Sequence, residues 1–422
     1  MDGLSGSYPH LEVVLRRRWF SFGPARNILF GHHQRCNRGT ISTCIRHIRK
    51  HRRESMAKRG GEMSTAAEVV RVFALSDLHT DYPENMEWVK NLPALQYRND
   101  ILIVAGDVAE TYNNFVLTMS ILKDRFRQIF FVPGNHDVWC RREQGRYLDS
   151  LEKLNALLDA CSMLGIDTSP SVVNDLGIVP LFSWYHEVRG YDLCRLYLII
   201  HVPLFPISPI QCGGDRLMKS FDKERDITDV WIPPLEMACK DFHACIWPCN
   251  LTSKDLSLAL HFDRMNVRYI HAVEEVQRKC SKIITFSHFI PRQELCPEKR
   301  MLFYPDLPKI IGSDCLEERL RYIHGAAEDG SACHIFGHTH FCWDALLDGI
   351  RYIQVPLAYP RERKRRMNGG EEWLPLCVYD SSSGGFLTSF FPCYWSDYYA
   401  KNERNPDVTE LAPWVARFYK RR

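Results

Sequence analysis

The chain of 422 residues lacks any hydrophobic run that is long enough to cross a membrane. A membrane-spanning helix needs about 20 consecutive apolar residues. The nearest approach, residues 196–207, is shorter and is interrupted by His201, Pro203 and Pro206. We therefore predict that the protein has no membrane span.

Cysteine pairs with the spacing of a zinc or redox site are also absent. No two of the 16 cysteines form a Cys-x-x-Cys pair, and the closest two, Cys245 and Cys249, have no second pair to complete a zinc site. Others lie inside apolar runs, as Cys280, Cys333 and Cys377 do. We interpret the cysteines as reduced core residues of an intracellular protein, and we expect a cytoplasmic location.

The greater part of the chain lacks an excess of basic residues. Residues 1–62 contain 13 Lys and Arg against 4 Asp and Glu, whereas residues 63–422 contain 41 against 47. This balance argues against a nucleic-acid partner, because proteins that bind nucleic acids carry a basic binding surface. We interpret residues 1–62 as a disordered extension. The alternatives are an upstream extension of the true start, or a transit peptide that would send the protein to a plastid or a mitochondrion.

From residue 69 onward, short apolar runs alternate with segments of helical spacing, which is typical of parallel βαβ units. We predict one domain over residues 63–395, followed by a C-terminal tail over 396–422. Residues 188–219 interrupt an otherwise coherent pattern, and we interpret them as an insertion. The expected strands are 69–76, 101–105, 129–133, 178–184, 282–287, 333–336 and 350–355, the expected helices are 114–126 and 146–164, and a β-hairpin is expected from 374–379 and 386–391.

Five short polar blocks follow these apolar runs in a fixed order. The carboxyl ends of parallel strands converge on one crevice, so we expect the blocks to lie together. Imidazole nitrogens and Asp or Asn oxygens suit Mn²⁺, Fe²⁺ and Zn²⁺. The glycines allow tight turns that bring the backbone close to a ligand. The blocks are Asp77-Leu78-His79, Gly106-Asp107-Val108, Gly134-Asn135-His136-Asp137, Ser287-His288 and Gly337-His338-Thr339-His340.

This set of blocks resembles the calcineurin-like metallophosphoesterase family, and the match extends over about residues 69–379. The resemblance implies an α/β fold, a four-layer α/β/β/α sandwich with mixed sheets. It also implies a binuclear centre of two divalent ions (Mn, Fe or Zn) that activates a hydroxide to hydrolyse a phosphate mono- or diester. By this similarity Asp107 would bridge the ions, Asp77, His79 and His340 would complete the first site, and Asn135, His288 and His338 would complete the second.

The same resemblance assigns His136 a role in catalysis rather than in metal binding. The corresponding histidine in the family lies beside the leaving-group oxygen, as a general acid or an electrostatic stabiliser. Glu110 stands three residues after Asp107, where related protein phosphatases have an aspartate that orients this histidine. Here the residue is a glutamate, which has a longer side chain, and we expect Glu110 to be a catalytic residue that pairs with His136.

Two other functions fit the same fold. A phosphoprotein phosphatase would carry the motif GDxVDRG at the second block and GNHE at the third, whereas the chain has GDVAET from residue 106 and GNHD from residue 134. The second histidine of the block at 337–340 resembles the phosphodiesterase branch more closely. A non-catalytic interaction module should have lost metal ligands, and none is missing here. We interpret the basic residues 361–366 as a solvated loop, with a phosphate-rich partner as the alternative.

Overall fold

The computed structural model of the protein describes residues 69–186, 221–325, 331–364 and 374–420. The basic extension at 1–62 and the suspected insertion at 188–219 lie outside the described residues, so both interpretations stay predictions. Among the described helices, none has both the length and the hydropathy needed to cross a bilayer.

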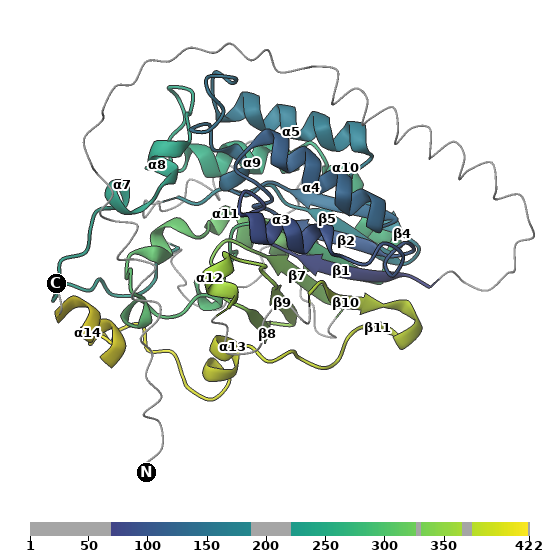
Figure 1. Cartoon of the computed structure of the whole chain (residues 1–422). Coiled ribbons are helices and arrows are strands. Elements are labelled where there is room, and N and C mark those ends of the chain that lie inside the picture. Colours follow the sequence, from purple (N-terminus) through teal and green to yellow (C-terminus); the bar gives the residue numbers. More distant parts are fainter. Residues whose placement is uncertain (1–68, 187–220, 326–330, 365–373, 421–422) are drawn as a thin grey trace, which may run out of the picture. The chain divides into compact units, whose positions relative to one another are not determined.

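The first of two sheets has the strand order β11-β10-β1-β2-β3 (Figure 1). Strands β1, β2 and β3 run parallel, and β10 is antiparallel to both β1 and β11. Parallel strands are covered on both faces, which explains the uninterrupted apolar sequence of the fully buried β2. The strands are β1 (Arg71–Leu75), β2 (Ile101–Ala105), β3 (Gln128–Val132), β10 (Leu376–Asp380) and β11 (Gly385–Phe386).

The second sheet has the order β4-β5-β6-β7-β9-β8. Its four central strands are parallel, while β4 and β8 are antiparallel edges that pair with β5 and β9. The expected hairpin of β10 and β11 is confirmed in the first sheet, whereas the strands β4 and β8 were not predicted. The strands are β4 (Ser171–Val173), β5 (Leu176–Pro180), β6 (Lys282–Phe286), β7 (Ala332–Phe336), β8 (Trp343–Leu347) and β9 (Ile350–Gln354).

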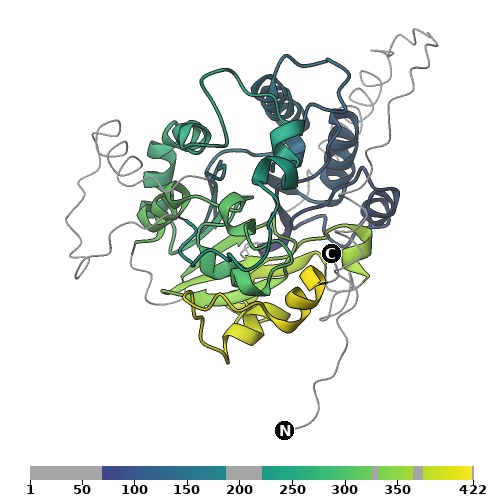
Figure 2. The same cartoon turned by 90° about the vertical axis from the view of Figure 1, so that its left-hand side faces the viewer.

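The two sheets pack face to face and are covered by helices on their outer sides (Figure 2). One buried cluster joins Ile103 and Phe130 of the first sheet to Phe286 and Ile335 of the second. Helices α3, α4 and α5 cover the first sheet, and α9, α10 and α11 cover the second. The predicted four-layer sandwich with mixed sheets is therefore confirmed. These helices are α3 (Pro83–Lys90), α4 (Tyr112–Arg125), α5 (Ser150–Leu164), α9 (Ser257–Val267), α10 (Ile270–Lys279) and α11 (Asp314–His324).

Short helices occupy the loops at the carboxyl ends of the strands and the C-terminal segment. They are α7 (Leu235–Ala238), α8 (Asp241–Ala244), α12 (Pro360–Arg363), α13 (Tyr394–Tyr399), α14 (Pro413–Lys420), η1 (His136–Val138), η2 (Gln293–Leu295), η3 (Lys299–Met301), η4 (Leu307–Ile310) and η5 (Ser381–Ser383).

The structure differs from three expectations made from the sequence. The boundary placed after residue 395 falls inside α13, and Arg363 of the basic stretch is buried rather than solvated. Eleven of the described cysteines are free, but Cys315 is disulfide-bonded.

Candidate metal centre

The residues of the five blocks lie where strands of both sheets end. Asp77 and His79 follow β1, Asp107 follows β2 and Asn135 follows β3, while His288 follows β6 and His338 and His340 follow β7. The two sheets meet at this point, because the backbone N–H of Ser76 donates to the carbonyl of Val355 (3.2 Å) and that of Leu357 donates to the carbonyl of Ser76 (2.9 Å). The fold therefore brings residues up to 263 positions apart in sequence into one site.

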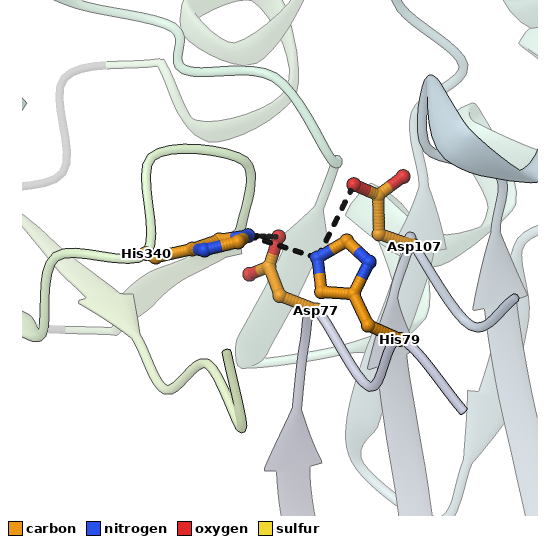
Figure 3. Close-up of side chains that lie close together, drawn as sticks. All are labelled: Asp77, His79, Asp107 and His340. Atoms are coloured by element: carbon orange, nitrogen blue, oxygen red, sulfur yellow. Dashed lines mark hydrogen bonds and ion pairs between the residues drawn. The ribbon is translucent and has the colours of Figure 1, made fainter. Parts of the chain in front are cut away.

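Asp77, His79, Asp107 and His340 form the first cluster, and their ligand atoms all lie within 4.8 Å of one another (Figure 3). The two imidazoles face each other, with 2.9 Å between the Nε2 atoms of His79 and His340. Nε2 of His340 also lies 3.4 Å from Oδ1 of Asp77. Nδ1 of His340 donates to Oε2 of Glu362 (2.7 Å), so its Nε2 presents a lone pair to the cluster.

Asn135, His288 and His338 form the second cluster. Oδ1 of Asn135 lies 3.1 Å from Nε2 of His288 and 3.1 Å from Nδ1 of His338. The other ring nitrogens donate to backbone carbonyls, that of His288 to Ala105 and that of His338 to Ile310, both at 3.0 Å. Three lone pairs therefore face one another with no hydrogen between them. This arrangement is repulsive unless a cation lies among them, so the donor set fits a metal ion.

Asp107 lies between the two clusters. Its Oδ2 is 3.8 Å from Nε2 of His79 in the first cluster and 3.5 Å from Nε2 of His288 in the second. The carboxylate is almost fully buried. This is the position that a ligand shared by two ions would occupy.

The protonation states of the second cluster agree with metal binding. Burial lowers the pKa of His288 to about 3 and also lowers the pKa of His338, so both imidazoles are neutral near pH 7, as ligands must be. In the first cluster, burial is outweighed by the charges of Glu362 and Asp77, which raise the pKa of His340 to about 10, so an ion bound there would have to displace its proton.

Burial and the charges of Asp137 and Asp77 raise the pKa of Asp107 well above its ordinary value. A buried carboxylate with this environment is costly when ionised, and a bound cation would remove the cost.

The backbone of the site is held in unusual conformations. Five predicted ligands have positive φ: Asp77 (53°), His79 (44°), Asp107 (55°), His338 (78°) and His340 (59°). L-residues rarely adopt this region, and such strain persists only where the surrounding structure enforces it. Strained residues of this kind concentrate at functional sites.

Asp137, the last residue of its block, ties two of the loops together. Its buried carboxylate accepts hydrogen bonds from the backbone N–H groups of Asp107, Val108, Ala109 and Gly134, at 2.8 to 3.1 Å. The loop that carries the shared ligand is thus fixed to the loop that carries Asn135. We had assigned no role to this residue from the sequence.

His136 lies beside the two clusters rather than within them. Its imidazole stacks on the ring of Trp139, with 3.6 Å between ring centroids. Nε2 of His136 lies 3.3 Å from Oη of Tyr359 and 3.9 Å from Oδ2 of Asp107. The side chain is 15% exposed, which is close to the 12% of the ligand candidate His340. The catalytic role of His136 therefore stays a prediction.

Glu110 has a strong partner of its own. Both of its carboxylate oxygens accept from the guanidinium of Arg141, at 2.5 and 2.8 Å. The pairing of Glu110 with His136 therefore stays a prediction, and it would have to compete with this two-point interaction.

Three residues that contact predicted site residues do not stand out in the sequence. Glu362 orients His340, Tyr359 approaches His136, and Asp241 of α8 accepts from the amide of Asn135. None of the three belongs to one of the five blocks. No spacing in the sequence signals them, because each reaches the site from a distant segment.

The chain is similar to known proteins. Residues 70–243 match the family described as calcineurin-like phosphoesterase. The [acyl-carrier-protein] phosphodiesterase PptH of Mycobacterium tuberculosis is 23% identical over 338 residues, which cover 79% of this chain and 92% of that protein. The crystal structure of the phosphopantetheinyl hydrolase PptH from the same organism is 21% identical, covers 72% of this chain and 94% of its own, and has a TM-score of 0.48.

Proposed function

Because this chain carries a calcineurin-like phosphoesterase domain and is a metal-dependent hydrolase of phosphate esters, we propose that its substrate is a phosphodiester. The substrate class we favour is a carrier protein that bears a phosphopantetheinyl group, whose phosphate joins pantetheine to the protein as a phosphodiester. The name of the M. tuberculosis relative supports this class, and the chain spans nearly the whole length of that relative. The second histidine of the block at 337–340 also favours a diesterase.

We propose that two divalent ions occupy the site. Asp77, His79 and His340 would hold the first, Asn135, His288 and His338 would hold the second, and Asp107 would be shared. When bound, two such ions polarise a phosphate and lower the pKa of a water that attacks phosphorus. The observation that carries the proposal is the set of lone pairs that converge on Asn135 Oδ1 beside a carboxylate that also faces the first cluster.

The remaining chemistry falls to the side chains around the ions. Glu362 and the backbone carbonyls of Ala105 and Ile310 fix the ring orientation of their histidine partners. In the proposed reaction, oxygen from water forms a bond to phosphorus, and the bond from phosphorus to the leaving oxygen breaks. His136 gives its proton to that oxygen, and Trp139 and Tyr359 hold the imidazole in place.

The test uses the full-length protein, stripped of metal with a chelator and reconstituted with Mn²⁺. The substrates are bis(p-nitrophenyl) phosphate, p-nitrophenyl phosphate and a phosphopantetheinylated acyl carrier protein. We expect about two ions per chain by elemental analysis, faster Mn²⁺-dependent cleavage of the diester than of the monoester, and loss of the phosphopantetheinyl mass from the carrier protein. Preference for the monoester, or an unchanged carrier protein, would reject the proposed substrate class.

A further inference from the structure

Asp241 is a buried carboxylate next to the second cluster, and only 2% of its surface is exposed. Its Oδ1 accepts two hydrogen bonds, from Nδ2 of Asn135 (2.8 Å) and from Nε1 of Trp139 (2.7 Å). Its Oδ2 is also buried and has no hydrogen-bond partner in the part of the chain that the structure describes. The resemblance to the phosphoesterase family assigned no residue to this position.

The first consequence concerns the amide of Asn135. An amide has one oxygen that can bind a metal and one NH₂ group that cannot, and the two ends are nearly identical in shape. Asp241 accepts only, so it pairs with the NH₂ group and directs the oxygen of Asn135 toward His288 and His338. Rotation of the amide by 180° would set an oxygen against the carboxylate and the NH₂ group against the lone pairs of the two imidazoles.

The second consequence concerns charge. A buried carboxylate is costly unless a cation neutralises it. Within the described residues, Asp241 forms no ion pair with a lysine, arginine or histidine. The second cluster consists of one neutral amide and two neutral imidazoles, so its only anionic member is the shared Asp107. A cation bound there would be the missing counter-ion of Asp241.

We propose that Asp241 is a positioning residue for the second metal ion, which it serves by orienting Asn135 and by supplying a compensating negative charge. The inference rests on the proposed two-metal function. It extends to His136 as well, because the same oxygen of Asp241 holds Trp139, on which the imidazole of His136 is stacked.

The test compares the full-length wild type with Asp241→Leu, which removes both the acceptor and the charge at similar size. Partners that act on metal ligands in this way typically change affinity by about 10- to 100-fold. We expect Mn²⁺ titration to show that Asp241→Leu retains one tightly bound ion and binds the second at least about 10-fold more weakly. Asp241→Asn retains an acceptor oxygen and should fall between the two.

The double variant Asn135→Asp with Asp241→Asn distinguishes a positioning role of Asp241 from a purely structural one. It exchanges the carboxylate and the amide, so the pair keeps its hydrogen bond, its net charge and an oxygen that faces the metal. We expect it to bind the second ion several-fold more tightly than Asp241→Leu. A purely structural role for Asp241 would predict no such recovery.

Asp263→Asn is the matched control, because Asp263 is a buried carboxylate outside the site that pairs with Arg319 at 2.8 and 3.0 Å. It should lower Tm while both ions remain bound. If the wild type binds two ions and Asp241→Leu binds both with unchanged affinity, the inference is wrong. If the wild type itself binds no second ion, the proposed function has failed instead. If Asp241→Leu does not fold, the other two variants decide. The proposed role of Asp241 is then wrong if Asp241→Asn binds the second ion as tightly as the wild type and the double variant binds it more weakly.

Discussion

At the scale of single residues, the candidate ligands could be found from the sequence but their supports could not. Each ligand lies in a short block directly after a strand, so strand prediction alone places all of them at one sheet edge. Glu362 of α12 contacts His340 and Asp241 of α8 contacts Asn135, and nothing in their local sequence distinguishes these two residues from ordinary surface acids. The ring nitrogen that a histidine turns toward its cluster is fixed by Glu362 or by a backbone carbonyl, and so it could not be predicted.

The shared position of Asp107 gives the first prediction. Asp107→Asn has the same shape but loses the charge and one acceptor oxygen, whereas in the wild type the same Oδ2 atom faces both clusters. We expect elemental analysis to show fewer ions at both sites rather than the loss of one, and hydrolysis to fall about 100-fold or more. Loss of a single ion with the other fully retained would show that the carboxylate is not shared.

His136 gives a prediction about the leaving group. His136→Ala should keep both ions and lose about 10²-fold or more in kcat on substrates with poor leaving groups. On an activated aryl diester the loss should be smaller, because that leaving oxygen needs less protonation. Kinetics on the two substrate types, with metal content measured on the same samples, checks this.

Tyr359 provides a graded comparison for His136. Tyr359→Phe removes only the hydroxyl that lies 3.3 Å from Nε2 of the imidazole, so it should give a milder form of the same pattern. If His136→Ala instead loses a metal ion while turnover per bound ion stays constant, His136 is a ligand or a structural support.

At the scale of helices and strands, the sequence predicts those strands whose two faces are both buried. The strand β2 is a continuous apolar run, and β7 is interrupted only by the buried His334, because both faces of these strands are covered. The edge strands β4 and β8 are partly exposed and mix polar with apolar residues, so their sequences carry no clear period. Their pairing depends on the neighbouring strand, which a single sequence does not reveal.

The turn after β3 yields a prediction about an element rather than a side chain. A Cβ added at Gly134 would lie 2.6 Å from the backbone nitrogen of Asp107, which real structures do not tolerate. Gly134→Ala should therefore separate the two loops that Asp137 joins, and reduce metal content together with activity. The control is Gly145→Ala, where φ is +73° but no atom lies within 4 Å of the new Cβ.

We expect Gly145→Ala to lower the free energy of unfolding by about 1–2 kcal/mol through backbone strain alone. Its metal content should equal that of the wild type. Equal metal content in Gly134→Ala would mean that the loop can move without disturbing the shared ligand.

At the scale of the whole molecule, the C-terminal segment is a structural part of the fold. Trp414 Nε1 donates to the carbonyl of Met301 (3.1 Å), and Val415 and Phe418 of α14 are buried. From the sequence, residues 396–422 are expected to form a tail that follows the last expected strand at 386–391. Its apolar face becomes visible only when its partner, the loop around η3, is known.

The packing of α14 can be tested with a matched pair of phenylalanines. Phe418→Ala should lower the free energy of unfolding by about 3–5 kcal/mol, the usual range for a buried aromatic residue. Phe390→Ala, at a side chain that is about half exposed (53%), should cost much less. Urea unfolding of both variants provides the measurement, and equal small effects would mean that residues 396–420 do behave as a tail.

The last prediction concerns the buried acid Glu224, far from the five blocks in sequence. Its carboxylate accepts from the backbone N–H of Lys299 (2.7 Å) and lies 3.6 Å from Arg404, so it joins three distant segments. Burial, which these two partners only partly offset, raises the pKa of Glu224 from about 4.5 to about 7. The folded state therefore holds this proton more tightly than the unfolded state does.

The sign of the pH effect follows from this difference. The contribution of Glu224 to stability is fully present below about pH 4.5, and it is lost as the pH rises through about 7. The expected loss is on the order of 2–3 kcal/mol. Urea unfolding at pH 5 and pH 8, in the presence of chelator, should show that the wild type loses more stability across this window than Glu224→Gln, which cannot ionise. Glu84→Gln, at an exposed site, should keep the wild-type pH dependence. If Glu224→Gln keeps it too, the proton is not held by this carboxyl, and the pH dependence of folding arises from other groups.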